Sequence, residues 1–90
     1  MKANVALVGS GYWGKNLVRN LNSLGVLSLI CDKNEATLSQ FQEFYPEVET
    51  CVAFSNVLSQ QDIEAIVIAT PAETHYTLAR EALLSGRHVL

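Results

Sequence analysis

The sequence predicts an α/β fold in which a doubly wound parallel sheet, with strand order 3-2-1-4-5, carries helices on both faces. Short apolar runs alternate with amphipathic segments along the chain, which is typical of successive β-α-β units. The 90 residues are 49% hydrophobic and only 17% charged, so we expect strands that are buried on both faces. Right-handed crossovers between such strands favour the doubly wound order. A chain of this length forms a single domain, residues 1–90.

The expected strands are nearly uninterrupted apolar runs, whereas the expected helices repeat apolar residues three and four positions apart. We expect strands at residues 3–8, 26–31, 49–53, 64–69 and 88–90. We expect helices at residues 14–24, 34–45 and 73–85, and a helical turn at 55–59. The sheet would be truncated after the start of its fifth strand, so we interpret these residues as the N-terminal piece of a longer protein.

Each expected helix has an apolar face and recognisable ends. These faces comprise Leu17, Val18, Leu21 and Leu24 in the first helix, Leu38, Phe41 and Tyr45 in the second, and Leu78, Ala79, Ala82 and Leu83 in the last. Gly25 and Gly86 follow the first and last helices as terminating residues. Asn34 is suited to cap the second helix, and Pro46 ends it.

A G-x-G-x-x-G pattern, formed by Gly9, Gly11 and Gly14, lies between the first strand and the first helix. Its glycines permit a tight turn, a close approach of a pyrophosphate and close helix–strand packing. The N–H groups that open the helix then hold the phosphate charge, so the pattern predicts a dinucleotide site rather than only a tight turn. Tyr12 and Trp13 would point outward, over the cofactor or toward another domain.

An acidic residue is expected about 20 residues after such a loop, and Asp32 ends the second strand 18 residues after Gly14. A carboxylate there accepts hydrogen bonds from both ribose hydroxyls of an adenosine and repels a 2′-phosphate, which favours NAD over NADP. Lys33 is a second candidate at this position, and its ammonium would tolerate that phosphate. The alternative for Asp32 is a turn or helix-capping residue.

Thr70 and Pro71 follow the fourth strand, and two interpretations place them beside the crevice where open α/β sheets bind ligands. In one, Thr70 caps the last helix, with Pro71 at its first position and Glu73 reaching back. In the other, Thr74 is the cap and the Thr-Pro turn lies over the carboxyl edge of the sheet. His75 is either a solvent-facing or capping residue or a neighbour of the cofactor, and no acid–base role is assigned to it.

Taken in order, these motifs resemble the N-terminal domain of the Gfo/Idh/MocA oxidoreductases over the whole chain. They are Gly-Ser-Gly-Tyr-Trp-Gly, Asp32, Ala-Thr-Pro-x-x-x-His at residues 69–75 and Gly-Arg-His-Val-Leu at residues 86–90. The resemblance implies a Rossmann fold in which Gly9, Gly11, Tyr12, Trp13 and Gly14 surround the pyrophosphate. It further implies that Asp32 binds the adenosine ribose and that Thr70, Pro71 and His75 flank the nicotinamide. The glycine segment resembles the nucleotide-sugar 3-dehydrogenase branch.

The resemblance implies an NAD-dependent oxidoreductase that moves a hydride between a nicotinamide and a hydroxyl of a sugar or nucleotide-sugar. The family's proton-transferring lysine and its later Asp/His pair are not among these residues, so we assign no catalytic residue here. We expect the 90 residues to bind cofactor without turning over a sugar, and the whole protein to be a homo-oligomer. The alternatives are a non-catalytic nucleotide-sensing module and a methyltransferase, whose cofactor lacks a pyrophosphate.

Composition excludes several other classes of function. The net charge of −3, without a basic stripe, argues against a nucleic-acid partner. No apolar run approaches the roughly 20 residues of a membrane span, and the first residues do not resemble a signal peptide, so we expect a cytoplasmic protein. Cys31 and Cys51 lack metal-ligand spacing, and no metal site is predicted. We interpret them as reduced core residues, with a disulfide as the alternative.

Overall fold

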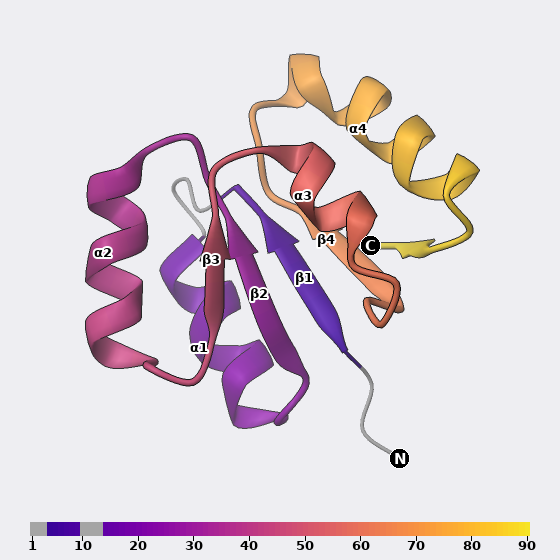
Figure 1. Ribbon diagram of the computed structural model, residues 1–90. Coiled ribbons are helices and arrows are strands. Elements are labelled where there is room, and N and C mark those ends of the chain that lie inside the picture. Colours follow the sequence, from indigo (N-terminus) through magenta and orange to yellow (C-terminus); the bar gives the residue numbers. More distant parts are fainter. Residues whose placement is uncertain (1–3, 10–13) are drawn as a thin grey trace.

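In the part of the chain that the structure describes, five parallel strands form one sheet with the order β3-β2-β1-β4-β5 (Figure 1). The computed structural model describes residues 4–9 and 14–90. The strands are β1 (Val5–Val8), β2 (Leu27–Cys31), β3 (Glu49–Cys51), β4 (Ala65–Ile68) and β5 (His88–Val89). The helices are α1 (Gly14–Ser23), α2 (Glu35–Phe44), α3 (Phe54–Ser59) and α4 (Ala72–Leu84). The predicted fold class and strand order are therefore confirmed, and every element lies close to its predicted range.

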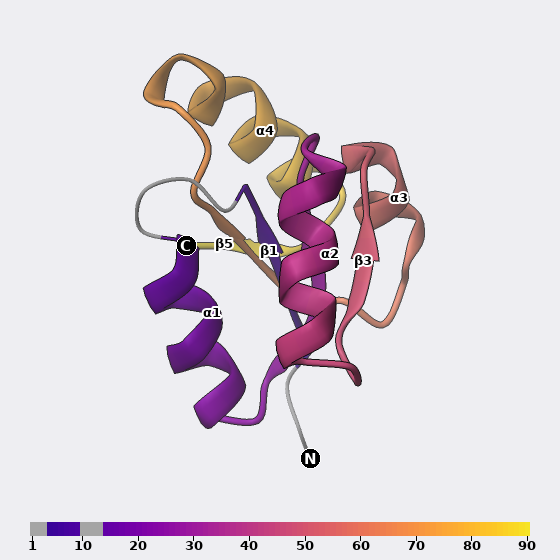
Figure 2. The same cartoon turned by 90° about the vertical axis from the view of Figure 1, so that its left-hand side faces the viewer.

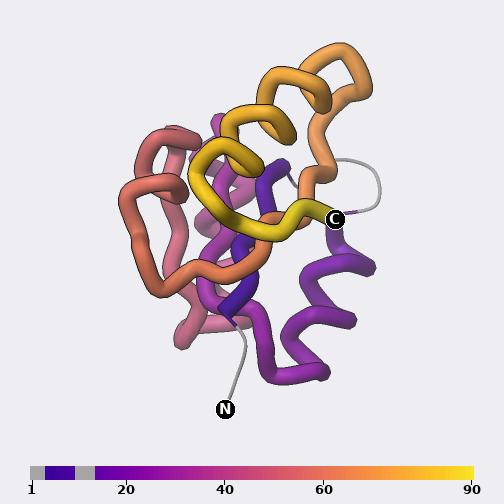
Figure 3. The backbone as a smooth tube through the Cα atoms, turned by 90° about the vertical axis from the view of Figure 1, so that its right-hand side faces the viewer, coloured from indigo at the N-terminus to yellow at the C-terminus, as the bar shows by residue number. Residues whose placement is uncertain are grey.

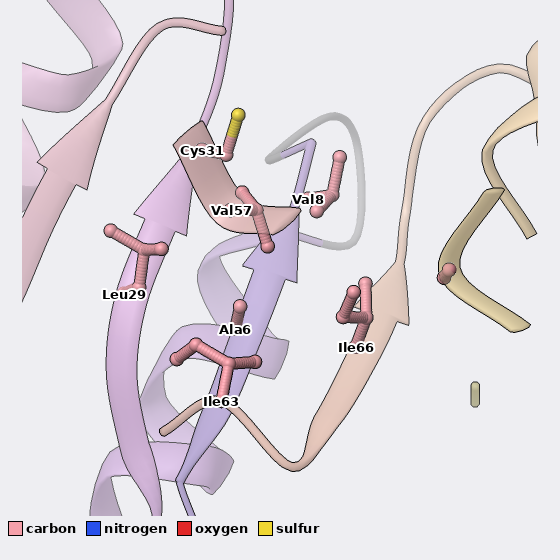
Figure 4. Close-up of a cluster of buried hydrophobic side chains, with 8 residues drawn as sticks. Ala6, Val8, Leu29, Cys31, Val57, Ile63 and Ile66 are labelled. Carbon is pink, nitrogen blue, oxygen red and sulfur yellow. The ribbon is translucent and has the colours of Figure 1, made fainter. Parts of the chain in front are cut away.

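Helices cover both faces of the sheet, and each face has its own buried cluster. Helices α1 and α2 pack against one face of the sheet, and α3 and α4 pack against the other. Figures 2 and 3 view the molecule from its two sides, and in both α1 and α3 lie on opposite sides of the strands. The first cluster comprises Leu7, Val18, Ile30, Leu38, Phe41 and Val48. The second comprises Ala6, Val8, Leu29, Cys31, Val57, Ile63, Ile66 and Ala82 (Figure 4).

The central strand β1 supplies side chains to both clusters. Leu7 belongs to the cluster under α1 and α2, whereas Ala6 and Val8 face α3 and α4. All four residues of β1 are buried, which is why this strand has no polar side chain. Full burial of a leucine or isoleucine stabilises the fold by about 1.5–3 kcal/mol, so these two clusters hold the strand ends in place.

The predicted ends of the second helix are confirmed in detail. The Asn34 side chain accepts a hydrogen bond from the Thr37 amide at 3.2 Å, which satisfies one of the free N–H groups at the start of α2. At the other end, the Tyr45 amide donates to the Phe41 carbonyl and Pro46 follows. Leu38 and Phe41 are buried on the predicted face.

Two leucines predicted on apolar helix faces are instead exposed. Leu24 is 72% exposed because α1 ends at Ser23, and the chain has begun to turn toward β2 at this residue. Leu83 is 61% exposed, whereas its neighbour Ala82 is fully buried. One step along a helix rotates a side chain by about 100°, so the contact made by Ala82 turns Leu83 off the packed face.

Candidate functional site

A pocket of about 440 Å³ opens at the carboxyl edge of the sheet, where β1, β2 and β4 end. We call it the carboxyl-edge pocket, and it is lined by Val8, Gly9, Cys31, Asp32, Lys33, Val52, Phe54, Ala69, Thr70, Pro71, Thr74 and Leu78. The helix that follows β1 lies on one face of the sheet and the helix that follows β4 lies on the other. The chain therefore changes face between β1 and β4, and such a switch point is where open α/β sheets bind ligands.

Gly9 occupies the tightest position in this pocket. Its φ of +85° lies in the left-handed region, which residues other than glycine rarely adopt. A Cβ added to Gly9 would lie 2.7 Å from Thr70 Cγ2 and 2.9 Å from the Thr70 amide nitrogen. The Gly9 amide also donates to the Cys31 carbonyl at 2.7 Å, which fixes the first residue beyond β1 to the end of β2. The first glycine of the predicted motif is thus required by both its conformation and its neighbour.

The rest of the glycine motif is divided between described and undescribed residues. Gly14 is buried at the first position of α1, as expected for a glycine that brings a helix close to a sheet. Gly11, Tyr12 and Trp13 lie outside the residues that the structure describes. Their predicted contacts with a pyrophosphate remain predictions.

Asp32 and Lys33 both line the carboxyl-edge pocket, as the sequence predicts. The Asp32 amide donates to the Cys51 carbonyl at 3.1 Å, so the backbone at this residue is held between β2 and β3. Its Oδ1 accepts a hydrogen bond from the Asn34 amide at 2.8 Å. This bond is an Asx turn, so Asp32 also fills the structural role that was its alternative. The turn fixes the carboxylate at the edge of the pocket.

Thr70, Pro71 and Thr74 form one wall of the pocket, but neither predicted capping scheme is correct. Pro71 itself is the N-cap of α4, and no side chain caps this helix. The Thr74 hydroxyl instead forms two local hydrogen bonds, one with Thr70 Oγ1 at 2.7 Å and one with the Pro71 carbonyl oxygen at 2.8 Å. These hydroxyl contacts tie the Thr-Pro turn to α4 and leave the turn over the sheet's carboxyl edge.

His75 lies beside this turn rather than in the lining of the pocket. Its Nε2 donates to the Thr70 carbonyl oxygen, and its side chain is otherwise exposed. The bond requires the tautomer that carries its proton on Nε2. His75 therefore holds Thr70, the residue that contacts Gly9, and does not itself line the pocket.

The apolar half of the pocket was not predicted from the sequence. Val52, Phe54 and Leu78 line it together with Cys31, and they come from the loop after β3 and from α3 and α4. Val52 is 43% exposed. The sequence prediction placed Val52 inside a strand at residues 49–53, whereas β3 ends at Cys51 and Val52 follows it at the edge where the parallel strands end. An apolar wall opposite a carboxylate suits a flat ring attached to a ribose.

Cys31, which is buried, also lines this apolar half. Burial, followed by the neighbouring Cys51, raises the pKa of the Cys31 thiol to about 12. Burial also raises the pKa of Cys51, although a hydrogen bond from Cys31 opposes the increase. Both cysteines are free thiols, as predicted.

A second hollow of about 670 Å³ lies at the opposite edge of the sheet, where β4 and β5 begin. Its main cation, Arg87, is occupied by the fold: its guanidinium donates to the Ile63 and Gln60 carbonyl oxygens. His88 lies here as the first residue of β5, within the strand predicted at residues 88–90. This hollow is far from the switch point, so the carboxyl-edge pocket is the candidate site.

Residues 4–9 and 14–90 contain no cluster of three or more histidine, cysteine, aspartate or glutamate side chains able to hold a metal ion. Among the helices described, none is both long and apolar enough to cross a membrane.

Comparison with known proteins gives a family match over nearly the whole chain. Residues 3–90 match an oxidoreductase family with an NAD-binding Rossmann fold. The WlbA dehydrogenase from Bordetella pertussis, solved in complex with NADH and UDP-GlcNAcA, is 32% identical and superimposes with a TM-score of 0.89. That match covers 99% of this chain and 28% of the WlbA chain.

Two further relatives bring different activities. The scyllo-inositol dehydrogenase from Lactobacillus casei, solved with NAD(H) and scyllo-inositol, is 25% identical, with a TM-score of 0.88 over 99% of this chain and 27% of its own. A curated glycosyl hydrolase family 109 protein from Shewanella amazonensis is 25% identical over 97% of this chain and 22% of its own length. The chain thus spans about a quarter of the length of the proteins that it matches.

Proposed function

Given that the chain belongs to the Gfo/Idh/MocA family of oxidoreductases, we propose that it binds NAD in the carboxyl-edge pocket. The observation that carries the proposal is the convergence of Gly9, Asp32 and Thr70 at the switch point of the sheet. When bound, the nicotinamide accepts or donates a hydride, which is the redox step of such enzymes. The chain itself binds and orients the cofactor.

The residues of the pocket suit the adenosine half of a dinucleotide. The Asp32 carboxylate, fixed by the Asn34 amide, accepts hydrogen bonds from the ribose hydroxyls. Val52, Phe54 and Leu78 provide the apolar surface for the adenine ring. The negative charge of Asp32 disfavours a 2′-phosphate, so we propose NAD rather than NADP as the preferred cofactor, with Lys33 reducing the difference.

The glycine segment and the Thr-Pro turn take the other parts of the cofactor. The backbone from Gly9 to Gly14 holds the pyrophosphate at the start of α1, where the helix dipole favours negative charge. Thr70 and Pro71, held by His75, flank the nicotinamide ribose and ring. Gly11, Tyr12 and Trp13 complete the proposed pyrophosphate site.

For the whole protein we propose hydride transfer to or from a hydroxyl of a sugar or nucleotide-sugar. The relatives that support this substrate class are the dehydrogenases solved with UDP-GlcNAcA and with scyllo-inositol. The groups that move the hydroxyl proton are proposed to lie outside these 90 residues, in the larger part of the protein. We also propose that the whole protein is cytoplasmic, which agrees with two free thiols, and that it forms a homo-oligomer.

A second candidate for the whole protein is cleavage of a glycosidic bond, which the curated relative from Shewanella amazonensis favours by its name. Incubating the whole protein with NAD and candidate sugars separates the two. Net formation of NADH supports the dehydrogenase, whereas release of a free sugar without net NADH supports the hydrolase. Cofactor binding without either reaction would support the nucleotide-sensing module.

The proposal for this chain is tested by titrating the folded 90-residue chain into NADH and following nicotinamide fluorescence. Circular dichroism first establishes that the sample is folded. We expect saturable binding of NADH, weaker binding of NADPH, competition by ADP-ribose and no competition by S-adenosylmethionine. A folded sample that does not bind NADH at millimolar concentration would overturn the proposal, and competition by S-adenosylmethionine alone would favour a methyltransferase.

A further inference from the structure

Cys31 and Cys51 are direct neighbours on adjacent parallel strands. The register of β2 and β3 pairs Cys31 with Cys51 at the last residue of both strands. Paired residues on neighbouring strands have Cα atoms about 4.8 Å apart, within the 4.4–6.8 Å that a disulfide requires. Cys31 belongs to the cluster under α3 and α4, and Cys51 packs against the same cluster, so both side chains leave the sheet on one face. Figure 4 shows Cys31 on that face with Leu29 and Val8.

The two thiols are neighbours, and each contacts the loop that follows β3. The Cys31 thiol donates a hydrogen bond to the Val52 carbonyl oxygen at 3.7 Å. The Cys51 sulfur lies 3.7 Å from the Ala53 carbonyl oxygen. Cys31 is 3% exposed, whereas Cys51 is half-buried and within reach of solvent. The pair therefore has one accessible sulfur and one protected sulfur beside it.

This pair is connected to the carboxyl-edge pocket through the backbone of both cysteines. The Cys31 carbonyl accepts the Gly9 amide at 2.7 Å, and the Cys51 carbonyl accepts the Asp32 amide at 3.1 Å. Cys31 also lines the pocket directly. A change in the distance between these two strand ends therefore acts on Gly9 and Asp32, which lie on either side of the pocket.

We propose that Cys31 and Cys51 form a redox modification site, at which a hydroperoxide converts the dithiol into a reversible disulfide at the floor of the carboxyl-edge pocket. The Cys51 sulfur attacks one peroxide oxygen, the O–O bond breaks and water or alcohol leaves, which gives a sulfenic acid. The Cys31 sulfur then attacks the Cys51 sulfur, the S–O bond breaks and water leaves. Two electrons pass from the sulfurs to the peroxide, and a dithiol reductant returns them.

The order of the two steps follows from the exposure and acidity of the sulfurs. Burial raises the pKa of both thiols, and Asp32 adds to the effect at Cys31 as Glu49 does at Cys51. Cys51 is the more exposed of the two residues, so Cys51 is the attacking group and Cys31 resolves the sulfenic acid. Because thiolate is scarce at neutral pH, the oxidation accelerates as the pH rises.

The effect on cofactor binding rests on the proposed function. A disulfide ends the hydrogen bonds from the two thiols to the Val52 and Ala53 carbonyl oxygens and so changes the loop after β3, which lines the pocket. We expect the oxidised chain to bind NADH at least about fivefold more weakly than the reduced chain, which is the lower range for coupling between two sites. Treatment with dithiothreitol restores the affinity of the reduced chain.

The first experiment detects the bond without using the cofactor. The folded chain is treated with hydrogen peroxide, free thiols are alkylated in denaturant, and peptides are mapped by mass spectrometry. We expect the loss of two hydrogen atoms and a peptide pair linked through Cys31 and Cys51 within one chain. Two thiols that oxidise independently, without an intrachain link, would overturn the proposal.

Matched variants then separate the two sulfurs. In Cys31→Ser, Cys51 retains its reactivity and accumulates as sulfenic acid, which dimedone traps. In Cys51→Ser, the buried Cys31 reacts at least about tenfold more slowly, as expected for a protected thiol. Equal reactivity of the two variants would contradict the assigned order. An intrachain link combined with unchanged NADH affinity would overturn the coupling, whereas a link in a chain that never binds NADH would refute the proposed function alone.

Discussion

Gly9 and Thr70 approach each other so closely that a methyl group on Gly9 would overlap the Thr70 side chain at 2.7 Å. The two residues are the first beyond β1 and the second beyond β4, and these strands are neighbours in the sheet. Their contact leaves no space for a side chain between Gly9 and the Thr-Pro turn. The packing of these two strand ends, as well as the proposed pyrophosphate, therefore requires a residue without a side chain.

A Gly9→Ala substitution tests this contact, and Gly86→Ala is its matched control. Both glycines have similar positive φ, 85° and 87°, but a Cβ at Gly86 would meet nothing within 4 Å. Left-handed backbone costs an alanine about 1–2 kcal/mol in each case. We expect Gly9→Ala to lower the free energy of unfolding by a further amount of about 1–3 kcal/mol, because of overpacking. Urea unfolding measures both, and equal losses would disprove the steric role of Thr70.

The two roles of Asp32 can be separated by comparing Asp32→Asn with Asp32→Ala. Asparagine keeps an oxygen that accepts the Asn34 amide, whereas alanine removes the Asx turn as well as the charge. We expect Asp32→Asn to retain the thermal stability of the parent and to bind NADH about tenfold more weakly, the value of one hydrogen bond to a charged group. Binding of NADPH should decrease less. Equal losses for the two cofactors would remove the ribose assignment.

Asn34 stabilises the start of α2 through its side chain. Replacing it with alanine removes the acceptor for the Thr37 amide, so we expect the free energy of unfolding to fall by about 1 kcal/mol. Gln40→Ala, at an exposed position in the middle of the same helix, is the control and should change stability by less than about 0.5 kcal/mol. Chemical denaturation of the two variants measures the difference.

The buried thiol of Cys31 makes stability depend on alkaline pH. Its pKa is raised from 9.0 to about 12 in the folded chain, so above pH 9 the unfolded chain loses a proton that the folded chain retains. Deprotonation then favours unfolding, and the free energy of unfolding decreases as the pH rises from 9 toward 12. Cys31→Val, which cannot ionise at this position, should reduce this decrease. An identical pH dependence in the variant would show that Cys31 does not cause it.

The sequence predicted the order of elements because each is encoded locally. A short apolar run such as residues 5–8, followed by glycines and an amphipathic segment, favours a strand buried on both faces, and the Asn34 cap is a pattern of adjacent residues. The positions of Gly9 and Asp32 at the candidate site were predictable for the same reason. Each of them directly follows a strand, and all the strands end at one edge.

Features that depend on contacts between distant segments were not predictable in this way. Whether Thr70 or Thr74 caps α4 depended on the path of the turn beside Gly9, and the N-cap is Pro71 instead. The exposure of Leu83 depends on which side of α4 faces the sheet. The pairing of Cys31 with Cys51 depends on the register of β2 and β3. A shift of one residue would place the two side chains on opposite faces of the sheet.

The backbone bonds just beyond the strands have a consequence for how this chain can change its specificity. The amides of Gly9, Asp32 and Ala69 each donate to a carbonyl of a neighbouring strand, so the first residue after β1, β2 and β4 is positioned by the sheet. A loop can therefore gain or lose residues beyond Asp32 or Ala69 without shifting the strands that precede it. Such insertions and deletions offer a route by which the same framework could accept a different ligand.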